Sequence, residues 1–212
     1  MLEANSMDSQ SNESEPSVVL IDGFPERDRD EISRMYWVAF GEKLRIALSP
    51  PDRAIEMLAE SLDPDYAIIA RSVDGQLLGV AGYKTPAGSF MAINFECLRR
   101  HFGIFGATWR GLVLSLLVRQ PAAGTLLMDG IFVTERARGQ GVGKLLLSGI
   151  KRKAKEQGCS QVRLDVIDTN PRAQQLYERE GFRAVAIRNL GPLRHVFGFR
   201  RATTMMAEVS KI

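Results

Sequence analysis

The stretch from Met128 to Ala154 constrains the fold of this chain more than any other, because its character changes twice. An apolar run ends at Val133, a glycine-rich stretch follows, and an amphipathic basic segment begins at Lys144. This order predicts a strand, a tight turn and a helix. Such a turn exposes backbone N–H groups at a helix N-terminus, where the helix dipole favours an anion. Because glycines let the backbone approach a ligand closely, the segment predicts a cradle for a pyrophosphate.

Two common phosphate-binding loops do not fit the spacing of these glycines. A Walker loop requires G-x-x-x-x-G-K-[ST], whereas Leu145 stands where its hydroxyl residue should be and Arg138 where its first glycine should be. A dinucleotide-binding fingerprint requires G-x-G-x-x-G, but the three glycines here form G-x-G-x-G. The pattern that does fit is R-x-x-G-x-G, with Arg138, Gly141 and Gly143.

A second block, from Asn170 to Phe182, reads N-x-x-A-x-x-L-Y-x-x-x-G-F. The stretch between the two motifs predicts a helix over Val142–Gln157 and a half-buried strand over Val162–Ile167, which alternates in polarity. The apolar face of this helix is expected to consist of Val142, Leu145, Leu146, Gly149 and Ile150. With the two motifs in this order, the chain resembles the GNAT superfamily of N-acetyltransferases over roughly residues 66 to 209. The resemblance implies an α/β fold with a mixed central β-sheet flanked by helices, the GNAT-like acyl-CoA N-acyltransferase fold. It also implies acetyl-CoA as the co-substrate.

The resemblance further implies roles for individual residues. The loop would bind the pyrophosphate of acetyl-CoA, and backbone groups of the preceding strand would pair with the pantetheine arm and supply an oxyanion donor. Tyr177 would give a proton to the departing sulfur, a task that suits a phenol because it is neutral at pH 7. Asn170 is a natural helix N-cap and is a second candidate for cofactor binding. The cofactor-binding candidates are Ile131, Phe132, Val133, Arg138, Gly139, Gln140, Gly141, Val142, Gly143, Lys144, Asn170 and Tyr177.

The general base is less defined by the sequence. Asp129 lies four residues before Val133, where relatives carry an acidic residue near the reacting amine, and is the leading catalytic candidate beside Tyr177. Asp165 is an alternative on the next strand, and Glu135 is better interpreted as a solvated loop residue. An amine that arrives neutral needs no strong base.

Composition predicts one domain and excludes several classes of protein. Residues 17–212 are expected to form a single acetyltransferase domain, and residues 1–16 a disordered tail without the features of a signal peptide. The net charge of +3 comes largely from one predicted helix, either as a solvated face or as support for an anionic cofactor, and nucleic-acid binding is not expected. The two cysteines and two histidines look isolated, which predicts a reduced, cytoplasmic protein without a metal. These four residues are Cys97, Cys159, His101 and His195.

The order of predicted elements is β-α-α-β-β-insert-β-α-β-α-β-β. Strands are expected near Ser17–Ile21, Tyr66–Val73, Leu77–Tyr83, Thr125–Val133, Phe182–Ile187 and Ala202–Val209, and helices over Pro25–Leu48, after Pro51 and after Asn170. Residues 87–123 form an apolar, helical insert, too short and too often interrupted by arginines to span a bilayer. The insert is expected to pack on the core, to line the substrate site, to form a homodimer surface or to lie at a membrane interface.

The function expected from these features is transfer of an acetyl group from acetyl-CoA to a primary amine of a small molecule or peptide. Two alternatives remain open, namely use of another acyl-CoA and a coenzyme A-binding sensor without turnover. The acceptor's identity cannot be derived from the sequence, but the acceptor site is expected to be lined by the first helices and the insert.

Overall fold

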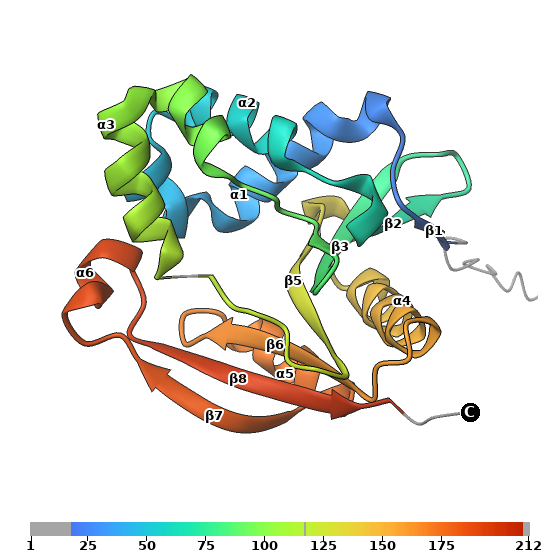
Figure 1. Cartoon of the computed structure of the whole chain (residues 1–212). Coiled ribbons are helices and arrows are strands. Elements are labelled where there is room, and N and C mark those ends of the chain that lie inside the picture. The colour runs from blue at the N-terminus through green and yellow to red at the C-terminus, as the bar shows by residue number, and fades with distance from the viewer. Residues whose placement is uncertain (1–17, 117, 210–212) are drawn as a thin grey trace, which may run out of the picture.

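The computed structural model describes residues 18–116 and 118–209, so the predicted tail lies outside the described residues (Figure 1). A central sheet in the order β1-β2-β3-β5-β6-β8-β7, with β4 on β3, is antiparallel except for the β5–β6 pair. The predicted mixed α/β fold is confirmed. The strands are β1 (Val18–Asp22), β2 (Ala67–Ser72), β3 (Leu77–Thr85), β4 (Gly88–Ser89), β5 (Thr125–Val133), β6 (Gln161–Ile167), β7 (Arg183–Asn189) and β8 (Arg201–Glu208). The helices are α1 (Arg29–Leu48), α2 (Pro51–Ser61), α3 (Phe95–Ser115), α4 (Val142–Glu156), α5 (Pro171–Arg179) and α6 (Arg194–Phe197).

Strand alternation divides the core between the two faces of the sheet. Ile68 and Ala70 of β2 pack in the cluster that includes α4, whereas Ala67 and Ile69 pack in the cluster beneath α1. Because side chains alternate along a strand, α4 covers one face of the sheet at β2 and α1 covers the opposite face. Helices α1, α2 and α3 lie together over one side of the sheet in Figure 1.

The buried stripe of α4 differs by one position from its prediction. The sequence pattern places Leu145 on the core face, but Leu145 is 38% exposed and Leu147 is buried. Two of the basic residues of this helix, Arg152 and Lys153, form ion pairs with Asp22 of β1. Only Lys144 among the basic residues of α4 lines the large cleft described below.

The predicted insert is largely α3, which begins at the N-cap Asn94 and bends at Gly103, where φ is +68°. Cys97, Leu98 and Ala107 are buried against α1 and α2. The opposite side remains exposed, including Phe105 at 89% and Leu112 at 69%. The core therefore covers one side of the insert only. In the part of the chain that the structure describes, no helix has the length and apolar character needed to cross a membrane.

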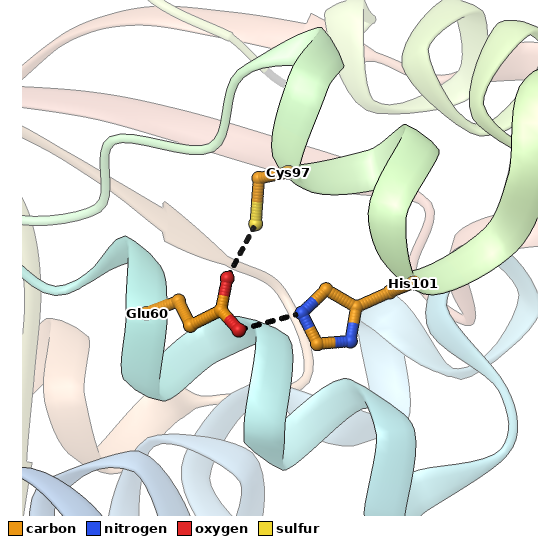
Figure 2. Close-up of side chains that lie close together, drawn as sticks. All are labelled: Glu60, Cys97 and His101. Atoms are coloured by element: carbon orange, nitrogen blue, oxygen red, sulfur yellow. Dashed lines mark hydrogen bonds and ion pairs between the residues drawn. The ribbon is translucent and has the colours of Figure 1, made fainter.

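The prediction that the cysteines and histidines are isolated is wrong for two of them. Cys97 and His101 lie one turn apart on α3, and both point toward Glu60 of α2 (Figure 2). His101 Nε2 is 3.2 Å from Glu60 Oε1, and Cys97 Sγ is 4.0 Å from Glu60 Oε2. These residue types bind zinc in other proteins. Here Arg100 lies 3.1 Å from Glu60 and the hydroxyl of Ser61 lies 3.5 Å from the thiol, so we interpret the cluster as a contact between α2 and α3.

Candidate active site

A bulge and a divergence of two strands create the cleft at the centre of the sheet. Gly130 pairs with Gly82 of β3 and Met128 pairs with Tyr83, so Asp129 is an extra residue on β5. A bulge bends its strand and increases its twist. On the other side, β5 pairs with β6 only from Thr125 to Leu127. Beyond Leu127 the backbone groups on this edge of β5 are free to pair with an extended ligand.

The cleft has a volume of about 1930 Å³ and extends from the divergent strands to the N-terminus of α4. Its walls come from α1, α3, α4, α5, β5, β6 and the segment before β8. The insert therefore contributes to the cleft, since Leu98, Gly111 and Leu114 of α3 line it. The exposed residues Phe105 and Leu112 are not among the lining residues, so the two sides of α3 differ in role.

The glycine-rich loop presents the N-terminus of α4 to one end of the cleft. Gly139 and Gly141 adopt left-handed conformations, with φ of +84° and +79°, which glycine adopts without strain. Gly141 is the N-cap residue and forms no side-chain cap hydrogen bond. The first N–H groups of any α-helix lack partners within the helix. Here they lie beside a cleft, where an anionic ligand can accept their hydrogen bonds.

Most of the sequence-predicted site residues line this cleft, and two do not. Gln140 is exposed, and its amide donates a hydrogen bond to the carbonyl of Arg136 (2.7 Å). The side chain of Val142 is buried in the core below the loop. Neither of these two residues is among those that line the cleft. The predicted residues that line the cleft are Asp129, Ile131, Phe132, Val133, Arg138, Gly139, Gly141, Gly143, Lys144, Asn170 and Tyr177.

Tyr177 lies on α5 with its ring buried against Phe182, at a centroid distance of 5.9 Å. Its hydroxyl has no hydrogen-bond partner among the residues that the structure describes, and the side chain lines the cleft. Burial raises the pKa of Tyr177 above the ordinary value for a phenol. The hydroxyl therefore keeps its proton at neutral pH and can donate it to a ligand. Asn170 caps α5, because its side chain accepts a hydrogen bond from Ala173 N (3.1 Å).

Asp129 projects into the cleft from the bulge of β5. Its side chain is open to the cleft, while protein atoms surround it on the other sides and the amide of Met91 donates to it (3.3 Å). Burial raises the pKa of Asp129, although the Met91 hydrogen bond and the charge of Lys84 act in the opposite direction. The same carboxylate helps burial to raise the pKa of Tyr36. A carboxylate with a raised pKa is a stronger base, which suits proton removal from an amine.

The environment of Asp129 predicts that ionisation of its carboxylate lowers the stability of the protein, the opposite of what an ion-paired carboxylate does. Its native pKa lies above the unfolded value, so the ionised carboxylate opposes folding at neutral pH. Asp129→Asn should therefore raise the melting temperature at pH 8, and the difference should vanish as the pH falls toward about 4. Asp22→Asn is the control, because its hydrogen bond with Arg152 lowers the pKa of Asp22 and this variant should lose stability at pH 8. Thermal unfolding between pH 8 and pH 4 tests both signs, and a destabilised Asp129→Asn variant at pH 8 would contradict this account.

The other two candidate bases are already engaged. Asp165 accepts a hydrogen bond from Thr204 Oγ1 (2.6 Å) and pairs with Arg119 and Arg163, each at 3.5 Å. Glu135 is exposed and pairs with Arg138 at 3.5 Å. Of the three carboxylates, Asp129 is the one held in the cleft without an ion-pair partner among the described residues.

Sequence reasoning missed the aromatic wall that faces Asp129. Tyr36, Phe40 and Lys43 lie at i, i+4 and i+7 on α1 and line the cleft. The Phe40 ring covers Gly130, where a Cβ would approach it to 2.9 Å. Phe199 lines the same region from the loop before β8. The helical spacing of the first three residues is visible in the sequence, but the spacing does not show which face of the helix lies toward the cleft.

The comparisons with known proteins agree with this geometry. Residues 29–182 match the model of the Acetyltransferase (GNAT) family, and the chain belongs to that family. This membership confirms the resemblance seen in the two sequence motifs.

The chain is similar to several acetyltransferases of known sequence or structure, each over a stated share of its length. It is 39% identical over 77 residues to acetyltransferase Atu2258 of Agrobacterium fabrum, covering 36% of this chain and 53% of the relative, about half its length. It is 28% identical to aminoglycoside N(6')-acetyltransferase type 1 of Serratia marcescens, covering 69% of this chain and 82% of the relative. A solved acetyltransferase structure superposes with a TM-score of 0.60 at 20% identity, over 91% of this chain and all of that one. The ribosomal-protein-S18-alanine N-acetyltransferase of Escherichia coli gives 0.55 at 16% identity, over 92% and 96%, and both show the fold alone.

Proposed function

We propose that this protein transfers an acetyl group from acetyl-CoA to a primary amine of a small molecule or peptide. The observation that carries the proposal is one continuous cleft with an uncapped helix N-terminus at one end and a neutral phenol and a carboxylate along its length. The helix N-terminus suits a pyrophosphate. The phenol and the carboxylate suit the two proton transfers that an acyl transfer to an amine requires.

Each group along the cleft has one role in this reaction. The loop amides and Arg138 hold the phosphates, and the free edge of β5 beyond Leu127 pairs with the pantetheine amides. Asp129 takes the proton of the incoming ammonium, directly or through a water molecule. The neutral amine nitrogen then attacks the thioester carbonyl and a C–N bond forms. As the C–S bond breaks, the nitrogen releases its second proton to water, which restores the proton that Tyr177 gives to the sulfur. Tyr177 delivers a proton to the departing sulfur, and a β5 backbone N–H stabilises the oxyanion.

Two alternatives keep the same cleft. One is a different acyl-CoA, because Leu98 and Leu114 of the apolar insert line the cleft and suit contact with a longer acyl group. The other is a coenzyme A sensor without turnover. The unpartnered hydroxyl of Tyr177 favours an enzyme, since a site that only senses the cofactor does not require a proton donor at its centre.

Thiol release tests the proposal directly. The protein is incubated with acetyl-CoA and a panel of primary amines, and free coenzyme A is measured together with the mass of the acetylated amine. Amine-dependent release with acetyl-CoA is the expected result. Faster release with succinyl-CoA or octanoyl-CoA would favour another acyl group, and tight binding without release for any amine would favour the sensor.

We also propose that the exposed side of α3 forms a homodimer interface. It carries a concentration of apolar side chains that the core does not cover, namely Ile104, Phe105, Trp109, Leu112 and Leu116. Leu112→Glu should then convert a dimer to a monomer without changing coenzyme A affinity, because Leu112 does not line the cleft. Analytical ultracentrifugation measures the mass, and Val73→Glu, at an exposed apolar residue after β2 that does not line the cleft, is the control. A wild-type protein that sediments as a monomer at all concentrations would contradict the proposal.

A further inference from the structure

The structure places a cationic group opposite the candidate base, at the far end of the aromatic wall of α1. Lys43 lines the cleft and is partly buried between two rings, with Nζ 5.3 Å from the Phe40 centroid and 6.0 Å from that of Phe199. No carboxylate in residues 18–116 and 118–209 forms a hydrogen bond with Nζ. Burial lowers the pKa of Lys43, with the charge of Glu42 acting in the opposite direction.

A partly buried ammonium without a carboxylate is costly unless a ligand supplies the opposite charge. Cation–π contacts with Phe40 and Phe199 offset some of this cost, but they leave the N–H donors of the ammonium unsatisfied. Asp165, which also lines the cleft, pairs with Arg119 and Arg163 rather than with Lys43. The ammonium of Lys43 is therefore available to a bound molecule.

The arrangement along α1 sets the order of groups that a ligand would meet. Tyr36 is close enough to Asp129 for the carboxylate to affect its pKa, and Phe40 lies against Gly130, the neighbour of Asp129. Lys43 follows one turn further along the helix. At 1.5 Å per residue, Tyr36 and Lys43 are separated by about 10 Å along the axis. The wall thus runs from a carboxylate, over two aromatic rings, to an ammonium.

We infer that the acceptor is an amine that carries an anionic group, such as a carboxylate, at the other end of an apolar spacer. This inference rests on the proposed function and specifies its substrate class. The amine lies at Asp129, the spacer lies on Tyr36 and Phe40, and Lys43 binds the anion through charge-assisted hydrogen bonds. The same arrangement disfavours polycationic acceptors, because a second ammonium would lie beside Lys43. Arg188, which also lines the cleft, adds to this preference.

A matched series of three amines tests the inference, because its members differ only in the terminal group. Binding of 8-aminooctanoate, octylamine and 1,8-diaminooctane to the coenzyme A-loaded protein is measured by calorimetry. The expected order of affinity is aminocarboxylate, then monoamine, then diamine, with about 10- to 100-fold between the first two. A diamine that binds as tightly as the aminocarboxylate, or an aminocarboxylate that does not bind, would overturn the inference.

Two variants test whether Lys43 causes the expected preference for the aminocarboxylate. Lys43→Met should remove the difference between the aminocarboxylate and the monoamine, and Lys43→Glu should reverse the order so that the diamine binds more tightly. Arg45→Glu is the control, because Arg45 is exposed on the same helix and does not line the cleft, yet its charge changes equally. An unchanged order in both Lys43 variants would overturn the assignment. Because these are binding measurements, they can succeed or fail independently of amine-dependent thiol release, which tests the proposed function.

Discussion

Replacing Tyr177 by phenylalanine should lower kcat by about 10²- to 10⁴-fold, the contribution expected of one positioned acid. The substitution removes only the hydroxyl, and the ring contact with Phe182 remains. Coenzyme A affinity should therefore change little, so the loss should appear in kcat. Steady-state thiol release, with single-turnover measurements to confirm that chemistry is rate-limiting, provides the test.

The matched control for this prediction is Tyr66→Phe. Tyr66 packs on Tyr83 at a centroid distance of 5.7 Å and does not line the cleft. Loss of its hydroxyl should leave kcat unchanged. Equal kcat for wild type and Tyr177→Phe, with chemistry rate-limiting, would reduce Tyr177 to a packing residue.

Replacing Gly141 by valine should reduce coenzyme A affinity by about 100-fold or more. A Cβ at this position meets no protein atom within 4 Å, so the new side chain would project into the space that the phosphates should occupy. It would also force a β-branched residue into a left-handed conformation, which distorts the amides of the loop. Loss of two charge-assisted hydrogen bonds, at about 1.5–3 kcal/mol each, accounts for this magnitude. Calorimetry with coenzyme A measures the change.

The Gly141→Val substitution adds backbone strain and also changes the proposed phosphate site, so a control that adds only the strain is needed. Gly75, in the turn between β2 and β3, has φ of +80° and open space around its Cβ position, so Gly75→Val introduces similar strain far from the cleft. This variant should lose stability and keep its coenzyme A affinity. Gly143 is a poorer probe, because a Cβ there would lie 3.1 Å from Leu176 and disturb the packing of α5 on α4. A folded Gly141→Val protein with wild-type coenzyme A affinity would contradict the proposal that this loop binds the pyrophosphate.

The local parts of this account follow from the sequence because their signals are local. The loop glycines, the Asn170 cap and the proline after it fix α4 and α5 within a residue or two of their predicted limits. The insert was also predicted as helical, and α3 occupies its centre.

The remaining features depend on contacts between segments far apart in the chain. The bulge at Asp129 is visible only in its pairing with β3, and the approach of Phe199 to Lys43 requires the loop before β8 to fold back over α1. The contact of Glu60 with Cys97 and His101 likewise depends on how α2 packs against α3. Sequence periodicity identifies the buried face of a helix but not the residues that face it.

The most direct test of the central claim is a crystal structure of the protein with acetyl-CoA. The account predicts that the pyrophosphate accepts hydrogen bonds from backbone N–H groups of residues 139–144, and that the pantetheine arm pairs with β5 between Met128 and Val133. It also predicts the thioester sulfur within hydrogen-bond distance of the Tyr177 hydroxyl, with Asp129 on the acceptor side. A pyrophosphate bound away from the α4 N-terminus, or a sulfur remote from Tyr177, would contradict the account.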